Sequence, residues 1–100
     1  MHFFILLEKL NYLNIINAAN KASEILTFDY FPKYYLYAQT IIGKAYCFLS
    51  EIENKEENLK LAIHYFDEAL KNFTQNDFPD EFNDITNLRE QARMALIQAK

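Results

Sequence analysis

The segment Leu59–Phe73, LKLAIHYFDEALKNF, decides the fold class of this 100-residue chain. Its apolar side chains recur three and four positions apart, which places them on one face of an α-helix. They are Leu59, Ala62, Ile63, Phe66, Ala69, Leu70 and Phe73. The polar residues between them occupy the opposite face. The segment is therefore predicted to be an amphipathic helix that packs against a core.

Three other stretches have the same spacing. One follows Pro32 (Ala38, Ile41, Ile42, Ala45, Leu49), one follows Pro79 (Phe82, Ile85, Leu88, Ala92, Leu96), and one runs from about Phe3 to Leu26. With one glycine and two prolines, the chain lacks the turn residues that an all-β fold needs every ~8 to 12 residues. We predict a single all-α domain, residues 1–100, of four antiparallel helices.

Several residues mark the expected helix ends. Pro32 and Pro79 are predicted in first turns, where the missing N–H would have no helical partner. Asn54–Glu57 has the pattern of a capping box, in which Asn54 and Glu57 satisfy free N–H groups. Asp80, Glu81 and Asp84 fall near the start of the last helix, where the helix dipole favours negative charge. We interpret this acidic cluster as helix-stabilising charge rather than a metal site.

The chain also contains an internal repeat. Phe31-Pro32 recurs 47 residues later as Phe78-Pro79. The same offset relates six further pairs: Ile16/Ile63, Ala22/Ala69, Thr27/Thr74, Ile41/Leu88, Ala45/Ala92 and Leu49/Leu96. A period of ~20 to 50 residues is typical of stacked helical arrays.

The middle unit resembles the tetratricopeptide repeat. Ile42-Gly43 followed by Tyr46 matches the Leu-Gly-x-x-Tyr motif of that family's first helix. Ala62, Phe66, Ala69 and then Pro79 match the motif of its second helix. Gly43 and the alanines would let the two helices approach closely, with Tyr46 and Phe66 filling the space between them. The usual unit has about 34 residues, so the chain resembles a long-repeat member, with its 13 extra residues expected mostly around Leu49–Asn58.

The resemblance implies a right-handed stack of helical hairpins. Its first and second helices, A and B, would follow in the order B-A-B-A: a half repeat over 1–30, a full repeat over 31–77 and a capping helix over 78–100. In the capping helix, Arg89, Glu90 and Arg93 replace Ile42, Gly43 and Tyr46. A terminal repeat needs such a polar outer face.

The amino-terminal helix is apolar on all sides at its start. One neighbouring helix cannot cover Phe3, Phe4, Ile5, Leu6 and Leu7, and large exposed apolar patches usually mark interfaces. The chain would fold back on itself, pair with a second copy, or be a piece of a longer protein. We predict self-association, as a homodimer, through Phe3, Phe4, Leu6 and Leu7. The run is too short to span a bilayer and lacks the flanks of a signal peptide.

Composition and motifs argue against other classes. The net charge of −4 and the absence of a basic stripe disfavour nucleic acid. The single Cys47 forbids an internal disulfide and fits a reduced, cytoplasmic setting. His2 and His64 have no second ligand at helical spacing, and Glu68 is expected to hydrogen-bond His64 at the surface. No catalytic or metal motif is present, so we predict no enzyme activity, cofactor or metal.

Binding of another protein is the remaining prediction. The resemblance implies a groove lined by first helices that receives a peptide or partner helix. Its residues here would be Tyr37, Thr40, Lys44, Cys47, Asp84, Asn87, Gln91 and Met94. The Lys/Asn/Arg set that grips a carboxyl terminus in some family members is not reproduced. Two alternatives are a self-assembling scaffold that uses the amino-terminal helix, and a domain that binds a small molecule between its seven tyrosines.

Overall fold

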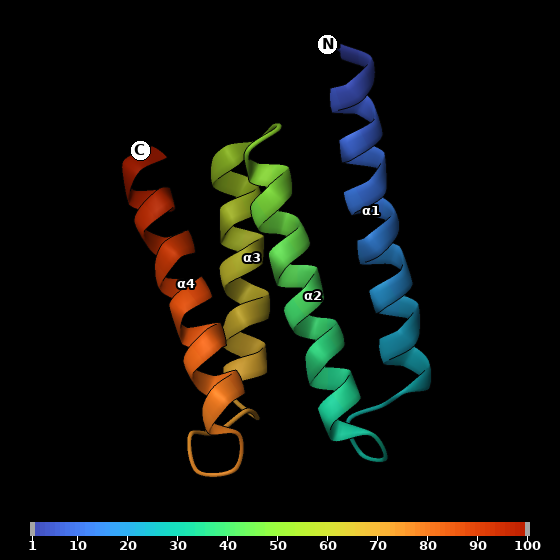
Figure 1. Cartoon of the computed structure of the whole chain (residues 1–100), viewed down its shortest axis with the longest axis vertical. Coiled ribbons are helices and arrows are strands. Elements are labelled where there is room, and N and C mark those ends of the chain that lie inside the picture. Colours follow the sequence, from blue (N-terminus) through green and yellow to red (C-terminus); the bar gives the residue numbers. More distant parts are fainter. Residues whose placement is uncertain (1, 100) are drawn as a thin grey trace.

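Residues 2–99 form four α-helices that alternate in direction (Figure 1). The computed structural model describes residues 2–99, and the helices are α1 (His2–Ile25), α2 (Pro32–Ser50), α3 (Lys55–Leu70) and α4 (Pro79–Ala99). Residues 2–99 contain no strand. The all-α prediction with four helices is therefore confirmed.

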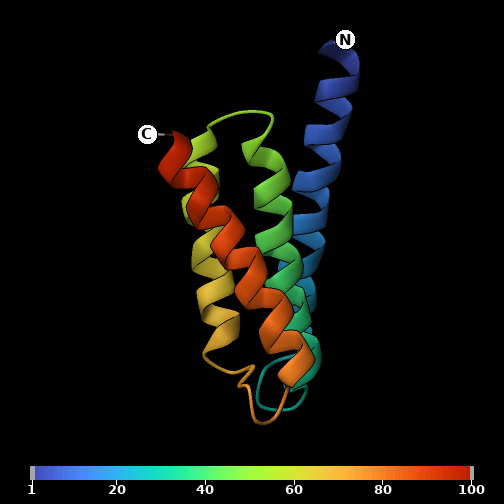
Figure 2. The same cartoon turned by 60° about the vertical axis from the view of Figure 1, so that its left-hand side comes forward.

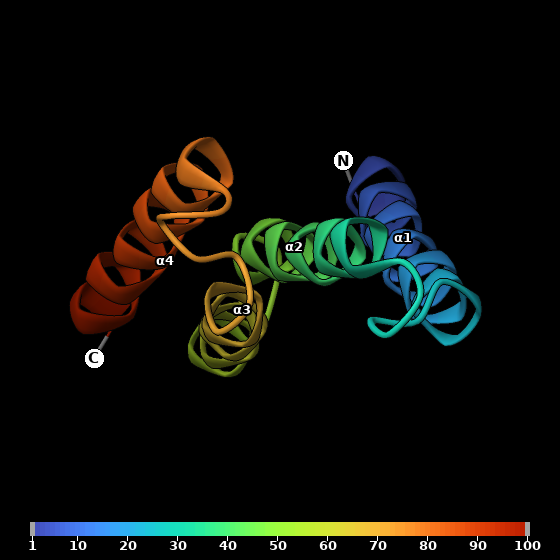
Figure 3. The same ribbon diagram turned by 90° about the horizontal axis from the view of Figure 1, so that it is seen from below.

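The helices form a flat, elongated layer. Seen along the helices, α1 and α4 lie at opposite ends of the molecule with α2 and α3 between them (Figure 3). Among the helices, α1 packs against α2 alone, and α4 packs mainly against α3. The molecule measures 43 × 30 × 18 Å, and its radius of gyration is 14.0 Å, above the ~13 Å of a compact 100-residue domain. This shape leaves one side of each end helix uncovered.

Two apolar clusters hold the helices together. The larger joins α2, α3 and α4, and contains Leu36, Leu59, Ala62, Phe66, Ala69, Phe73, Ile85 and Ala92. The smaller joins α1 to α2, and contains Ile16, Ala19, Ala38, Ile42, Ala45 and Leu49. Tyr46 packs against both. Because burial of one large apolar side chain contributes about 1.5–3 kcal/mol, the larger cluster contributes most of the stability.

The close approach predicted at Gly43 is confirmed. A Cβ atom added to Gly43 would lie 2.6 Å from Cε1 of Phe66, whose side chain is completely buried. The Tyr46 ring stacks on that of Tyr65, with 5.8 Å between centroids. Glycine therefore allows α2 to contact the ring at the centre of α3.

The prediction for the two prolines is also confirmed, since α2 begins at Pro32 and α4 at Pro79. Each of these helices is preceded by a turn, and the same type of backbone hydrogen bond closes both turns. The N–H of Phe31 donates to the carbonyl of Thr27 at 2.8 Å, and the N–H of Phe78 donates to the carbonyl of Thr74 at 2.8 Å. These two turns are 47 residues apart and have the same local geometry.

The predicted capping box is wrong. Asn54 has left-handed backbone angles (φ 46°, ψ 54°), and its side chain makes no capping hydrogen bond to α3. Instead, the amide of Asn58 donates to the carbonyl of Glu53 at 2.8 Å. Asparagine tolerates left-handed angles better than most residues, so Asn54 serves the turn rather than the helix end.

The extra length expected around Leu49–Asn58 is not concentrated there. α2 continues to Ser50, a turn occupies 51–54, and α3 begins at Lys55. The two helices have 19 and 16 residues, so the 47-residue unit is long chiefly because its helices are long.

Two of the three α4 residues that were expected to face solvent do so. Glu90 and Arg93 face solvent. Arg89 instead leans on α3 and is half-buried: its Nη1 donates to Oδ1 of Asp67 at 3.3 Å, and its buried Nε has no hydrogen-bond partner. The expectation of a water-facing side chain is wrong at Arg89, because α3 presents a carboxylate there.

Candidate interaction surfaces

The first half of α1 presents a continuous apolar surface to solvent. We call it the α1 stripe, and it consists of Phe3, Phe4, Leu6, Leu7, Leu10 and Leu13, each at least 39% exposed. The rings of Phe3 and Phe4 contact each other edge to face. The amino-terminal end of α1 also projects past the ends of the other helices (Figures 1 and 2). The alternative in which the chain folds back to cover these residues is therefore wrong.

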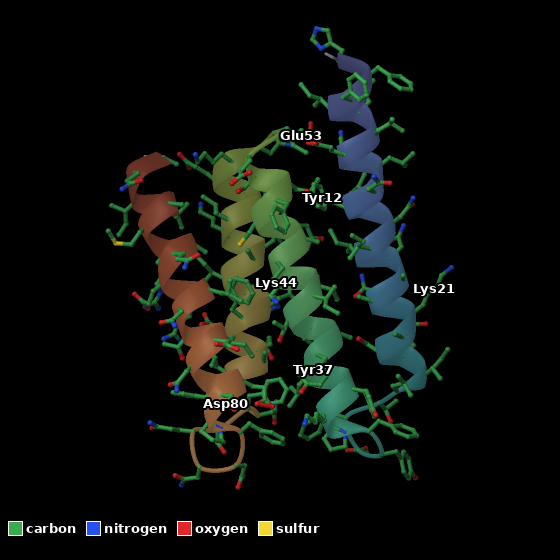
Figure 4. The ribbon with its side chains drawn as sticks, in the orientation of Figure 1. Tyr12, Lys21, Tyr37, Lys44, Glu53 and Asp80 are labelled. Carbon is green, nitrogen blue, oxygen red and sulfur yellow. The ribbon has the colours of Figure 1, made fainter. Side chains whose placement is uncertain are left out.

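The second half of the same outer face is polar. Asn14, Asn17, Lys21 and Glu24 are exposed there, and Lys21 points away from the other helices (Figure 4). The apolar surface thus ends at about Leu13, three turns into the helix. A surface that is apolar over a defined length and polar beyond it is suited to one partner of limited extent.

The inner face of α1 is attached to α2 by specific contacts. The Tyr12 ring stacks on that of Phe48, with 5.1 Å between centroids and 8° between planes. Lys9 pairs with Glu53 in the turn after α2 (Figure 4). Nε2 of Gln39 donates to Oγ of Ser23 at 3.1 Å. These contacts fix which face of α1 remains exposed.

A second candidate surface is a groove between α2 and α4 with α3 as its floor. It has a volume of ≈ 460 Å³, and we call it the α2–α4 groove. Its lining residues are Lys44, Cys47, Phe48, Ser50, Glu51, Lys55, Leu59, Leu88, Gln91, Ala92 and Ala95. Lys44 extends from α2 toward α4 (Figure 4). The floor is apolar, and the charged side chains stand on the α2 side and at the start of α3.

The predicted groove residues divide into three sets. Lys44, Cys47 and Gln91 line the α2–α4 groove. Asn87, Gln91 and Met94 line a shallow hollow that runs along α4 alone, where no second wall exists. The remaining three are Tyr37, Thr40 and Asp84.

None of those three lines the groove. Thr40 is buried, and its hydroxyl donates to the carbonyl of Leu36 at 2.9 Å. Tyr37 lies near the other end of α2 (Figure 4), where its ring contacts Phe73 and the Lys33 ammonium lies 5.7 Å from its centroid. Asp84 is exposed near the start of α4.

Cys47 is half-buried in the α2–α4 groove. Burial, and next the nearby charge of Glu51, raise the pKa of its thiol to about 11. Because the thiolate is the reactive form, this cysteine is protonated and slow to react near neutral pH. It serves the groove as a small apolar side chain.

Sequence reasoning missed the apolar residues that α3 and α4 contribute to the groove. They are Leu59, Leu88, Ala92 and Ala95, which the helical spacing assigns only to the core or leaves unassigned. Ser50 and Glu51 follow Cys47 by one helical turn and continue the side of α2 that Lys44 and Cys47 occupy. That position in the sequence could have located the groove's upper end. No such signal existed for α4, because its rotation relative to α2 sets which side chains face the groove.

The remaining titratable groups form no chemical site in the part of the chain that the structure describes. No cluster of three or more His, Cys, Asp or Glu residues suited to a metal occurs within residues 2–99. The expected bond between Glu68 and His64 is wrong: Glu68 accepts from Nζ of Lys71 at 2.9 Å, and the His64 ring contacts Tyr65. The hydrogen bond and charge of Lys71 lower the pKa of Glu68. No tyrosine lines the α2–α4 groove, whereas Tyr12 lines a smaller hollow between α1 and the end of α2.

Comparison with protein-family models, with curated proteins and with solved structures found no match to this chain. Within the described residues, no helix has the length and apolar content needed to cross a bilayer.

Proposed function

We propose that this chain is a non-enzymatic protein–protein interaction module that holds an apolar peptide or helix of a partner in the α2–α4 groove. The observation that carries the proposal is the groove itself, which has a volume of ≈ 460 Å³ and lies between two parallel helices. Its floor is apolar, it is open to solvent, and charged side chains stand at its edge. Grooves of this kind bind amphipathic helices or extended peptides through a few apolar anchors. A cytoplasmic location belongs to the same proposal, because the single thiol needs no oxidising compartment.

A tetratricopeptide-like stack is part of this proposal. It is supported by the glycine contact between Gly43 and Phe66 and by the matching turns that end at Phe31 and Phe78. In such a stack, α2 and α4 would be equivalent first helices, and the groove between them would be the concave binding surface. α1 would then be a second helix.

The lining residues define the chemistry of the ligand. Leu59, Leu88 and Ala92 would accept a side chain of the size of leucine or phenylalanine. Lys44 and Lys55 stand at the edge, with Glu51 between them in the lining. A ligand with one apolar anchor flanked by an acidic residue would therefore fit best.

The test is a selection of peptides from a displayed library against the chain. Ala95→Trp would extend into the groove from a partly buried position that lines it, and Met94→Trp, at the adjacent and exposed position of α4, is the matched control. We expect the selected peptides to share an apolar anchor, to bind wild type and Met94→Trp equally, and to lose at least tenfold in affinity for Ala95→Trp. Equal binding to a folded Ala95→Trp variant would contradict the proposal.

Folding of the variants is checked first by circular dichroism. Lys44→Glu provides a second variant, because Lys44 is exposed and its replacement leaves the core intact. This variant should weaken the binding of peptides that have an acidic residue beside the anchor and leave the binding of other peptides unchanged.

A further inference from the structure

Four residues of the α1 stripe form a seam along the helix, and their spacing in the sequence is the same when it is read in either direction. Phe3, Leu6, Leu10 and Leu13 are separated by three, four and three residues. This is the a/d pattern of a two-helix coiled-coil seam. Reversal of the helix about position 8 superposes Phe3 on Leu13 and Leu6 on Leu10. Such a seam is complementary to its own antiparallel copy.

We propose that two copies of this chain form a two-fold dimer in which their α1 stripes pair antiparallel, centred near Glu8. Phe3 of each copy packs against Leu13 of the other, and Leu6 packs against Leu10. Leu7 flanks the seam, and the Phe4 ring lies against that of Phe3. This assembly goes beyond the groove function, because it uses the outer face of α1, which lines no part of the α2–α4 groove.

A symmetric pair of α1 stripes is favoured over a head-to-tail contact because only the α1 seam matches its own reversed copy in spacing. The outer face of α4 has Met94 and Ile97 exposed, but Glu90, Arg93 and Gln98 surround them. Burial of these charged and amide groups against the α1 stripe would leave them unpaired, at a cost in free energy. Other exposed apolar side chains among the described residues lie around the turn between α1 and α2 and do not form one helical seam: Ile25, Phe28, Tyr30, Phe31 and Tyr34.

The exposed area sets an upper limit to what such a pair can bury. At about 200 Å² for each large side chain, the value for aromatic residues, the α1 stripe presents at most roughly 650 Å² per copy. Complete burial of both stripes would give roughly 1,300 Å², at the low end of the ~1,200–2,000 Å² of specific interfaces. The projection of α1 beyond the other helices (Figure 2) gives a second copy access to this surface.

The polar residues in the second half of α1 favour the antiparallel orientation of the pair. A parallel pair would continue the seam through Asn17 and Asn20 and bring Glu24 opposite its own copy. Antiparallel pairing about Glu8 covers only residues 3–13 and leaves Asn17 and Lys21 in solvent. The orientation that buries the apolar half alone is therefore preferred.

The first test is the absolute mass in solution, measured by light scattering across a concentration series. We expect a mass near twice 11.9 kDa for the wild type and a monomer for Leu6→Glu/Leu10→Glu. The control Asn14→Glu/Asn17→Glu adds the same charge to the polar half of the same face and should remain dimeric. A monomeric wild type at all concentrations, or a Leu6→Glu/Leu10→Glu variant that is folded and still dimeric, would overturn the proposal.

The second test establishes the orientation by disulfide cross-linking in a Cys47→Ser background. Phe3→Cys/Leu13→Cys should form covalent dimers on oxidation, because each copy places position 3 beside position 13 of the other. Phe3→Cys or Leu13→Cys alone should give none, since the like positions are about 15 Å apart along an antiparallel pair at 1.5 Å per residue. Efficient cross-linking of either single variant would show a parallel pair and refute this orientation.

Discussion

At the scale of single residues, Gly43 sets the distance between α2 and α3. An added methyl group would approach Cε1 and Cδ1 of Phe66 to 2.6 and 2.8 Å, and that ring is completely buried. Overpacking of this kind costs typically ~1–3 kcal/mol, whereas alanine improves helix propensity by up to ~1 kcal/mol. We expect Gly43→Ala to lower the free energy of unfolding by about 1–2 kcal/mol, as measured by urea denaturation.

A double-mutant cycle separates the clash from other effects. Phe66→Leu removes ring atoms that the new methyl group would contact, so Gly43→Ala should be much less harmful in that background. If the two substitutions were simply additive, the close contact between Gly43 and Phe66 would not be the cause.

Cys47 provides a prediction about pH. Burial and Glu51 raise the pKa of its thiol from 9.0 to about 11, so the thiolate fraction at pH 8 is about a hundredfold lower than for an unperturbed thiol. Alkylation by iodoacetamide should be slower by about that factor than for a small thiol in solution, and its rate should keep rising to about pH 11. Glu51→Gln should accelerate the reaction. A rate that levels off near pH 9 would contradict the burial.

At the scale of the elements, two adjacent isoleucines test how α1 is attached. Ile16 is buried against α2 at 6% exposure, whereas Ile15 is 41% exposed. Replacement of a buried isoleucine by alanine lowers the free energy of unfolding by about 2–5 kcal/mol. We expect Ile16→Ala to destabilise the junction of α1 and α2 by about 2–4 kcal/mol and Ile15→Ala by under about 1 kcal/mol. The measurement is thermal unfolding followed by the circular dichroism of both variants. Equal losses would mean that α1 is rotated relative to this structure.

Apolar spacing was enough to predict the number of helices and their approximate positions. The stripes of α2, α3 and α4 follow the helical period, and Pro32 and Pro79 begin helices because proline is compatible with the first turn alone. The buried contact of Gly43 with Phe66 was also predictable, since a lone glycine within an apolar helix has a packing reason.

Features that depend on neighbouring elements were not predictable. Asn54 has a sequence typical of a capping residue, but the short turn after α2 forces left-handed angles there. Arg89 was expected in solvent, yet Asp67 of α3 holds it. The groove was partly missed for the same reason: Lys44 and Cys47 on α2 were correctly placed, but the rotation of α4 brings Leu88 and Ala92 to the groove in place of Asp84.

At the scale of the whole molecule, the helices contact one another almost entirely in chain order, because α1 and α4 lie at opposite ends and do not meet. In such arrays stability is roughly a sum of local units and their nearest-neighbour interfaces. α1 and α4 each bury two residues, but α1 packs against one helix whereas α4 contacts two, so α1 is the helix with the fewest neighbours. α2 has neighbours on both sides and contains the largest number of buried residues.

Amide hydrogen exchange should therefore be graded along the chain. We expect the slowest exchange in α2 and α3 and the fastest helical exchange in α1, since protection follows the free energy of local opening. Exchange is measured by mass spectrometry of peptic fragments at two protein concentrations. At low concentration, residues 3–13 should exchange faster than residues 14–25, because Ile16 and Ala19 anchor only the second half. At high concentration, pairing of the α1 stripes should reverse that order, and the Leu6→Glu/Leu10→Glu variant should keep the low-concentration order throughout. Uniform exchange across all four helices would instead indicate one cooperative unit, with α1 held as firmly as the core.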